Sequence, residues 1–465
     1  MTPRLALLIA YSAALVVIGL LVARRVRGSA DFFVAGRRLP PLLLFATVLA
    51  SNIGAGSTVG AAALAYRDGL GAWWWNGAAA AGSVVLALVV GPRVWRLASQ
   101  HGLYTAGDLL ELRYGRLVRA LVTSLIWLGT LSILAGQLIA GAAVLGVVAD
   151  VPRFEGTIIG AAVMTAYFMA GGLLSSAWVN LVQLVVLLAG FAVAVPMVIA
   201  GAGGLSAILA PAGAPATFGD IMHSSGAGSG WTLLLLFGPA FIVSPGLMQK
   251  AYGAVDESAV RWGIGAQAVA LALFSFAPVL LGMAGRTVYP DLQATDTVLP
   301  LVLAERLPAW TGALALAAVF SAEVSTCDAL LFMLSTSLSQ DLYKRFVSPA
   351  ATDRQVLMAA RAAALAGGAG GVLLALQLPT VQTALGIFYS LLGVSLLVPV
   401  VGGLFLARAG QREALASIGA GTAGLLVVRF AFPAKPAWLD PTMAGLVCAA
   451  AAFAIMLTTR RHDIG

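Results

Sequence analysis

The sequence predicts an all-helical protein that crosses a membrane many times, and three observations lead to that class. Sixty per cent of the 465 residues are hydrophobic and only 10% are charged, which is not the balance of a water-soluble globular chain. Apolar runs of about 20 residues, long enough to cross the hydrocarbon core, recur along the whole chain. Two of these runs carry helix-breaking residues at their centres, a feature that membranes tolerate where the backbone lines a cavity.

We expect thirteen membrane spans, oriented by the distribution of the basic residues. With the N-terminus outside, 20 of the 27 Lys and Arg residues fall in cytoplasmic segments, the bias that the positive-inside rule describes. An odd number of spans then places the C-terminus in the cytoplasm. We interpret the basic residues, Arg119 and Lys250 among them, as topological anchors in the plasma (inner) membrane of the cell. The predicted spans are 5–22, 40–65, 70–92, 120–148, 156–173, 177–200, 231–249, 262–285, 309–337, 356–376, 380–407, 413–431 and 441–459.

Composition argues against several other classes of protein. The net charge of +8 follows from topology, so we expect no nucleic-acid partner, and nothing indicates an obligate protein partner. Cys327 and Cys448 both lie in apolar runs far apart in the chain, which implies no disulfide framework. The first apolar run has no convincing cleavage site, so we interpret it as a retained span.

The second span, 40–65, is expected to be broken at its middle. Glycine weakens a helix, and three glycines stand there among Ser51, Asn52, Ser57 and Thr58. An unwound backbone at this depth can coordinate a cation directly. The alternative is a close-packing glycine face, whose spacing Gly56 and Gly60 satisfy.

The seventh span, 231–249, contains two prolines and two glycines, and one undisturbed helix cannot hold them. The two broken spans open two blocks of five spans, and the odd number inverts the second block relative to the first. Interrupted spans at matching positions of inverted halves indicate a binding site at the middle of the membrane. The predicted division is 1–39 (a peripheral span and a cytoplasmic amphipathic segment), 40–200 (first repeat), 201–230 (extracellular connection), 231–409 (second repeat) and 410–465 (two peripheral spans).

The ninth span, 309–337, carries polar residues in an apolar helix. On a helix, Ala322, Ser325 and Thr326 share one face, and one carbonyl with two hydroxyls would suit sodium. The alternative is that both hydroxyls bond back to carbonyls of their own helix. Glu323 and Asp328 lie off this face, and charged groups at membrane depth normally face a cavity.

Several segments resemble the sodium/solute symporter family in order and spacing. Residues 31–37 read DFFVAGR, and residues 325–328, STCD, precede a DLY at 341–343. Residues 171–173, GGL, precede the Trp178-Val179-Asn180 stretch, and residues 388–392 with Pro399 and 403–405 resemble the family's tenth core span. The likeness covers nearly the whole chain. It implies a five-plus-five inverted-repeat fold with discontinuous first and sixth core helices.

The resemblance also implies site residues. Sodium would be bound by the backbone carbonyls of Ala50, Ile53 and Ala322 and by the hydroxyls of Ser325 and Thr326. The chain departs from the family at Asn180, where many members carry Asp associated with a sodium exit path or a second sodium site. We therefore expect one sodium per cycle. We interpret Asn180 and Asp328 as coupling or network residues, while Glu323 has no assigned role.

The solute is expected between the two broken spans, beside the cation. The candidate wall residues are Asn52, Ser57, Trp75, Asn76, Gln137, Phe241, Ser244 and Tyr389. The run Trp73 to Trp75 opens a span, where tryptophan usually anchors at the interface, although one ring must point into the bundle. No arginine or lysine is expected in the pocket to hold a carboxylate.

These features predict a secondary active transporter that couples inward sodium movement to uptake of a small organic solute by alternating access. A proton-coupled symporter that uses Glu323 or Asp328 is the first alternative. An intramembrane enzyme is less expected, because the spans contain no HExxH, GxSxG or Ser/His/Asp pattern. A transporter-like sensor is a third alternative.

Overall fold

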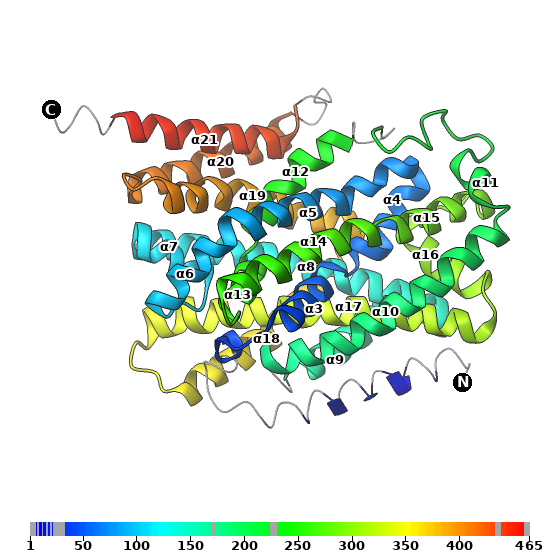
Figure 1. The fold of residues 1–465 in the computed structure, drawn as a ribbon, viewed down its shortest axis with the longest axis horizontal. Helices are drawn as coiled ribbons and strands as arrows, with labels where there is room; N and C mark the ends of the chain where they lie inside the picture. Colours follow the sequence, from blue (N-terminus) through cyan, green and yellow to red (C-terminus); the bar gives the residue numbers. More distant parts are fainter. Residues whose placement is uncertain are drawn as a thin grey trace.

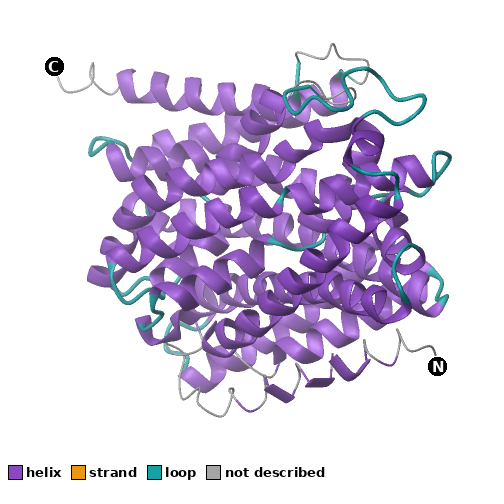
Figure 2. Ribbon diagram, turned by 45° about the vertical axis from the view of Figure 1, so that its right-hand side comes forward, coloured by secondary structure: helices purple, strands orange, loops and turns teal. Residues whose placement is uncertain are grey.

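The computed structural model describes residues 33–169, 173–223, 230–432 and 439–459, together with single positions between 6 and 21. The described residues form helices, apart from loops and one isolated β-bridge between Leu39 and Ala254. The long helices lie roughly parallel or antiparallel to one another in a single bundle (Figures 1 and 2). The predicted all-α membrane fold is confirmed.

The helices of the first predicted repeat follow the expected order. A short η1 (Ala35–Arg37) precedes them, and α7 (Ala106–Tyr114) connects the second span to the third. The elements that span this repeat are α3 (Pro41–Asn52), η2 (Gly56–Gly60), α4 (Ala61–Asp68), η3 (Gly69–Ala72), α5 (Trp73–Val85), η4 (Leu86–Val90), α6 (Gly91–His101), α8 (Arg116–Ala149), α9 (Arg153–Met169) and α10 (Leu173–Gly201).

The second predicted repeat has the same succession, and α11 (Leu205–Leu209) lies in the connection between the two. The elements of the second repeat are α12 (Gly230–Ile242), α13 (Pro245–Tyr252), α14 (Glu257–Phe274), α15 (Phe276–Val288), η5 (Thr295–Thr297), α16 (Val298–Glu305), α17 (Ala309–Thr336), η6 (Ser337–Val347), α18 (Asp353–Ala375) and α19 (Val381–Phe405). Two further helices, α20 (Gln411–Ala431) and α21 (Pro441–Thr459), pack against each other at one side of the bundle (Figure 1).

Both expected helix breaks are present. The first helix stops at Asn52, and Ile53 has extended dihedral angles (φ −97°, ψ 92°) before the chain winds again at Gly56. The second break separates α12 from α13, where Ser244 is extended (φ −55°, ψ 118°). Pro245 explains the second break, since proline lacks an N–H and disfavours helical geometry in the residue before it.

The helix contacts repeat in a way that two related halves would produce. In the first half α3 packs on α14 of the second, and in the second half α12 packs on α5 of the first. Likewise α8 packs on α19, and α17 packs on α10. Each pair becomes the other when the corresponding helices of the two repeats are exchanged. This exchange is the arrangement expected of an inverted five-plus-five core.

The thirteen predicted spans are represented to different extents. Ten helical stretches of the described residues are long and apolar enough to cross a membrane. The part of the second predicted span after the break and the third span form one such stretch, Gly56–His101, whereas Pro41–Asn52 is a separate, shorter apolar helix. The helix α9, with 17 residues, is also shorter than a full span. The first predicted span falls largely outside the described residues, although Tyr11 within it hydrogen bonds to Ser321 of α17 at 2.5 Å.

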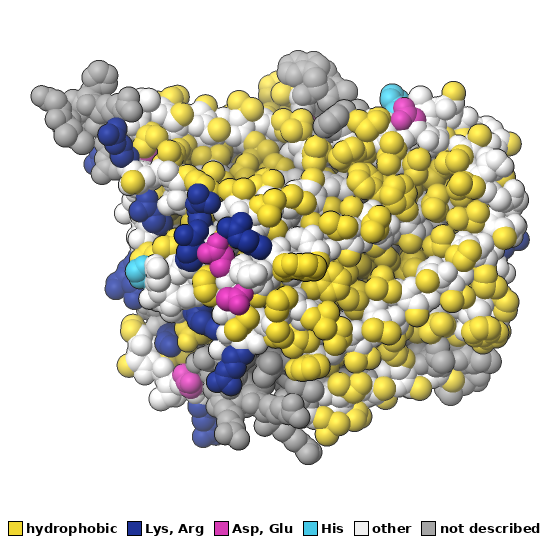
Figure 3. Space-filling model, viewed as in Figure 1, with side chains coloured by type: hydrophobic (Ala, Val, Ile, Leu, Met, Phe, Trp, Pro, Cys, Tyr) yellow, Lys and Arg dark blue, Asp and Glu magenta, His cyan; other side chains and the backbone are white. Residues whose placement is uncertain are grey.

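Surface charge is concentrated at one end of the bundle. In Figure 3 most of the visible Lys and Arg side chains gather at the left, over the region of α6 and α7, and a broad hydrophobic surface extends over the middle and right of the view. This is the distribution expected of a membrane protein whose basic end lies at the cytoplasmic surface.

Candidate functional site

The break after α3 and the middle of α17 bring together all five residues predicted to bind sodium. Ser325 Oγ donates to the carbonyl oxygens of Ala50 and Ala322, each at 2.9 Å. Thr326 Oγ1 lies 3.3 Å from the carbonyl oxygens of both Ala50 and Ile53. Three carbonyl and two hydroxyl oxygens therefore converge between two buried helices. Such an all-oxygen set suits a hard cation.

Local structure explains why these oxygens are available. The last carbonyls of a helix have no partner in a following turn, and α3 ends at Asn52. The hydroxyl of Ser325 bonds both to its own helix and across to α3, whereas Thr326 bonds only across. Gly54 permits this approach, because a Cβ there would lie 2.3 Å from Thr326 Oγ1.

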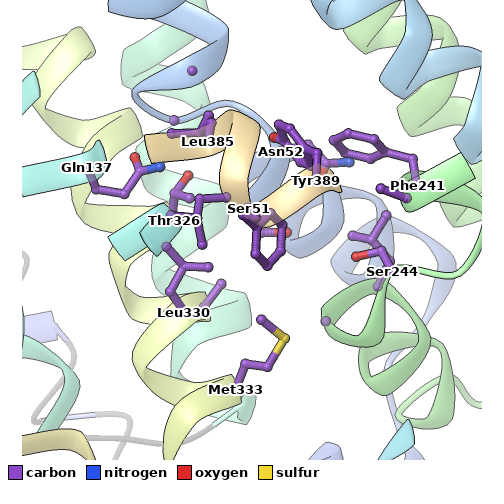
Figure 4. A pocket seen from close by; sticks show the side chains of 18 of the residues that line it. Ser51, Asn52, Gln137, Phe241, Ser244, Thr326, Leu330, Met333, Leu385 and Tyr389 are labelled. Atoms are coloured by element: carbon purple, nitrogen blue, oxygen red, sulfur yellow. The ribbon is translucent and has the colours of Figure 1, made fainter. Parts of the chain in front are cut away.

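A cavity of about 60 Å³ reaches this set of oxygens at Thr326, and its walls come from both broken helices and from α8, α17 and α19. In Figure 4, Tyr389 and Phe241 lie toward one side of this cavity, and Leu330 and Met333 lie at another. Six of the eight predicted solute residues line it. These six are Asn52, Ser57, Gln137, Phe241, Ser244 and Tyr389.

The other two predicted solute residues lie outside the cavity wall. Trp75 is buried against the rings of Phe237 and Tyr389, at centroid distances of 4.7 and 6.4 Å. Asn76 donates through Nδ2 to the carbonyl of Ser57 at 3.2 Å, so its amide supports the backbone of η2. Trp73 donates to the carbonyl of Ala272 in α14, away from the cavity. These side chains support the wall from behind.

Two amides supply polar groups beside the cavity. Gln137 Oε1 accepts a hydrogen bond of 2.7 Å from the backbone N–H of Ala55, which fixes the unwound segment to α8. Asn52 Nδ2 is buried and has no hydrogen-bond partner among the described residues. A buried donor without a partner is costly, so this amide is a candidate to bind a solute acceptor.

The expectation that the pocket holds no lysine or arginine was wrong. Lys250 lines the cavity, is only 3% exposed, and donates from Nζ to the carbonyl of Thr47 at 2.6 Å. The residue follows the predicted end of its span at 249, and for that reason it was assigned to the cytoplasmic surface. Because α13 starts only at Pro245, Lys250 lies in its second turn and inside the bundle.

The predicted network residues lie on the same side of the sodium-site residues as Lys250. Asn180 Nδ2 donates to Thr47 Oγ1 at 3.0 Å, and Asp328 follows Ser325 by three residues, about one helical turn, on α17. Glu323 lies elsewhere, with Oε2 facing Gly141 of α8. Neither carboxyl oxygen of Glu323 has a hydrogen-bond partner within the described part of the chain.

A cluster of ion pairs closes the end of the bundle where α7 packs on α8. Arg119 contacts the carboxylates of Asp108, Glu111 and Asp341 at 2.7, 2.7 and 2.6 Å. Arg119, interpreted from the sequence as a topological anchor, is 6% exposed and also pairs with carboxylates within the fold. Burial acts to raise the pKa of Glu111, but Arg119 and Arg345 outweigh it and lower that pKa below the ordinary value.

A second set of contacts closes the opposite end. Asp296 accepts a hydrogen bond from the backbone N–H of Val381, the first residue of α19, at 3.2 Å. Burial raises the pKa of Asp296 above its ordinary value, although the Val381 bond opposes this. Gln382 donates to the carbonyl of Gly60 at 3.0 Å. Together these bonds join the start of α19 to η2 and to the loop before α16.

Known proteins resemble this chain over most of its length. The chain is 29% identical to a sodium/pantothenate symporter of Escherichia coli over 332 residues, which cover 67% of this chain and 66% of that protein. It is 24% identical to a sodium/glucose cotransporter of Vibrio parahaemolyticus over 399 residues, with 76% and 71% covered. The chain thus spans slightly less than two thirds of the pantothenate symporter.

A solved structure has the same fold. A sodium-coupled sialic acid symporter, captured with substrate in an outward-open state, matches with a TM-score of 0.82 at 19% identity, and the match covers 98% of both chains. These relatives are sodium-coupled transporters. The model of the sodium:solute symporter family matches residues 32–421, and the chain belongs to that family.

Proposed function

We propose that this protein is a secondary active transporter that couples inward movement of sodium to uptake of a small organic solute by alternating access, without enzymatic chemistry. The observation that carries the proposal is the convergence of Ala50, Ile53, Ala322, Ser325 and Thr326 beside the cavity. A sodium ion there would contact the end of α3, and the unwound residues that follow α3 line the cavity. Occupancy of one site would thereby favour the other.

The cavity indicates how the solute would be held. Amides of Asn52 and Gln137 and the hydroxyl of Ser244 would bind polar groups, and the rings of Phe241 and Tyr389 would cover an apolar part. The cavity of about 60 Å³ is small beside typical ligand pockets of ~300–1,000 Å³, so the walls must separate to admit a solute. That movement is the one that alternating access requires.

The proposed orientation places the N-terminus outside and the C-terminus in the cytoplasm of a plasma (inner) membrane. With this orientation, the Arg119 cluster closes the cytoplasmic end and the Asp296 bond closes the extracellular end. We further propose the division into 1–39, 40–200, 201–230, 231–409 and 410–465. The exchanged helix pairs described above support it. We expect a small solute and the bilayer as partners, and no nucleic acid or obligate protein partner.

Uptake into proteoliposomes tests the proposal. Purified protein is reconstituted and exposed to radiolabelled carboxylates, sugars, amino acids and quaternary amines under a sodium gradient, a proton gradient or neither. We expect one solute class to accumulate only with inward sodium. Accumulation driven by protons without sodium would contradict the proposal and favour the proton-coupled alternative. Glu323, which faces α8 instead of the cavity, gives that alternative little geometric support.

A further inference from the structure

Lys250 is a buried cation in the cavity wall to which neither the proposed solute contacts nor the proposed sodium site assigns a role. Its ammonium lies 2.6 Å from the Thr47 carbonyl oxygen, and the residue is 3% exposed. An ammonium group at membrane depth is costly unless oxygen atoms and an opposite charge replace its water. The contacts of Lys250 should therefore resemble those of a cation-binding site.

These contacts lie one helical turn away from the proposed sodium site. Thr47 precedes Ala50 by three residues on α3, and Asp328 follows Ser325 by three residues on α17. The two helices run in opposite directions, as the packing of Phe33, just before α3, on Phe332, late in α17, indicates. One turn back on α3 and one turn forward on α17 therefore lead to the same level of the bundle.

Three chemical groups lie at that level, and the Thr47 carbonyl accepts directly from Nζ. The Asp328 carboxylate, 6% exposed, lies one turn beyond Ser325 on α17, where its negative charge favours a cation. The Asn180 amide bonds to the hydroxyl of the same Thr47. A carbonyl, a carboxylate and an amide are also the ligand types that a hard metal cation takes.

We propose that the Lys250 ammonium occupies a second cation site, formed by Thr47, Asp328 and Asn180, and acts there as a tethered cation in place of a second sodium ion. The inference rests on the proposed sodium coupling and extends it. It explains how the buried Asp328 carboxylate can be tolerated with one sodium bound. It also assigns Lys250 a role in setting the number of ions carried per cycle.

The proposal predicts that removal of the lysine creates a sodium site. Lys250→Ala removes the charge and opens space beside the Thr47 carbonyl and the Asp328 carboxylate. Binding of ²²Na⁺ to purified protein should rise from about one ion per chain in the wild type to about two. Lys250→Arg, which keeps a positive charge, should remain at about one. The double variant Lys250→Ala/Asp328→Asn, which lacks both charges, should also return to about one.

The possible results distinguish failure of the proposed function from failure of this inference alone. A wild type that binds no sodium would overturn the proposed function and this inference with it. A wild type and a Lys250→Ala variant that both bind one ion would overturn the inference alone. Loss of solute binding in that variant at unchanged sodium stoichiometry would instead assign Lys250 to a solute carboxylate. If Lys250→Ala fails to fold, Lys250→Gln serves as the second variant, since it removes the same charge. We expect Lys250→Gln to bind about two sodium ions, and binding of only one ion would contradict the inference.

Discussion

Replacement of Thr326 by alanine is the substitution that tests the sodium site most directly. Thr326 Oγ1 lies between two carbonyls of the unwound segment, and the residue is 4% exposed. A sodium ion that enters this position loses most of its water, so each missing protein oxygen leaves charge uncompensated. Hydrogen-bond-strength contacts to a charged group contribute about 1.5–3 kcal/mol.

That free energy converts directly into an expected change in affinity. With about 1.4 kcal/mol for each factor of ten, Thr326→Ala should weaken sodium binding by roughly ten- to a hundredfold. Because the two sites are linked, the apparent solute affinity at fixed sodium should also fall, and high sodium should partly restore it. Ser325→Ala should act in the same direction, since its hydroxyl also reaches the Ala50 carbonyl.

The same helix supplies matched controls ten residues further on. The hydroxyls of Ser335 and Thr336 both donate to the carbonyl of Phe332 in their own helix, and both residues are buried. Ser335→Ala and Thr336→Ala should therefore leave the sodium dependence of uptake close to that of the wild type. The assay is initial uptake rate against external sodium in proteoliposomes. Wild-type sodium dependence in both Ser325→Ala and Thr326→Ala would refute the proposed site.

Four further predictions concern the rest of the molecule. A reporter fused to the C-terminus should be cytoplasmic and one inserted near Gly213 external; both on one side would contradict the proposed topology. Uptake should depend on sodium with a Hill coefficient of about one, and a sigmoidal curve would argue for a second transported ion. Gly54→Ala should abolish uptake, because the added Cβ would lie 2.3 Å from Thr326 Oγ1. The control Gly160→Ala should transport normally, because a Cβ there meets no other described atom within 4 Å. Because the pKa of Glu111 is lowered, its carboxylate stabilises the fold at pH values above the ordinary glutamate pKa, and this contribution disappears as pH falls through the lowered pKa. Glu111→Gln should therefore reduce thermal stability at pH 7 and reduce it less in acid. An equal loss of stability at both pH values would contradict this.

The sequence was sufficient for the fold class and for the helix face whose oxygens converge at the proposed sodium site. Hydrophobic runs determine the spans, because a membrane requires every backbone polar group to be paired within a helix. Breaks were predictable from clusters of glycine and proline, which destabilise the interior of a helix. Ala322, Ser325 and Thr326 share a face by helical geometry alone, and their spacing indicated a cation site.

Only the tertiary structure decided which residues line the cavity and which support it. Trp75 and Asn76 lie in the first turn of α5, and packing against Phe237 and a hydrogen bond to the Ser57 carbonyl keep them out of the cavity wall. Side-chain direction at such positions depends on the neighbouring helices, which local sequence does not specify. Arg119 shows the same limit. The sequence pattern of basic residues predicts a position at the membrane surface, and Arg119 is nevertheless buried among three carboxylates.

Lys250 shows most plainly what the sequence alone could not determine. By position it follows an apolar run, where a lysine normally marks the membrane surface. Its depth depends on where the broken helix restarts, at Pro245, and its partners come from α3 and α17, which are distant in sequence. Burial of a charge depends on such long-range oxygen atoms and counter-charges, so it becomes visible only once the helices are assembled.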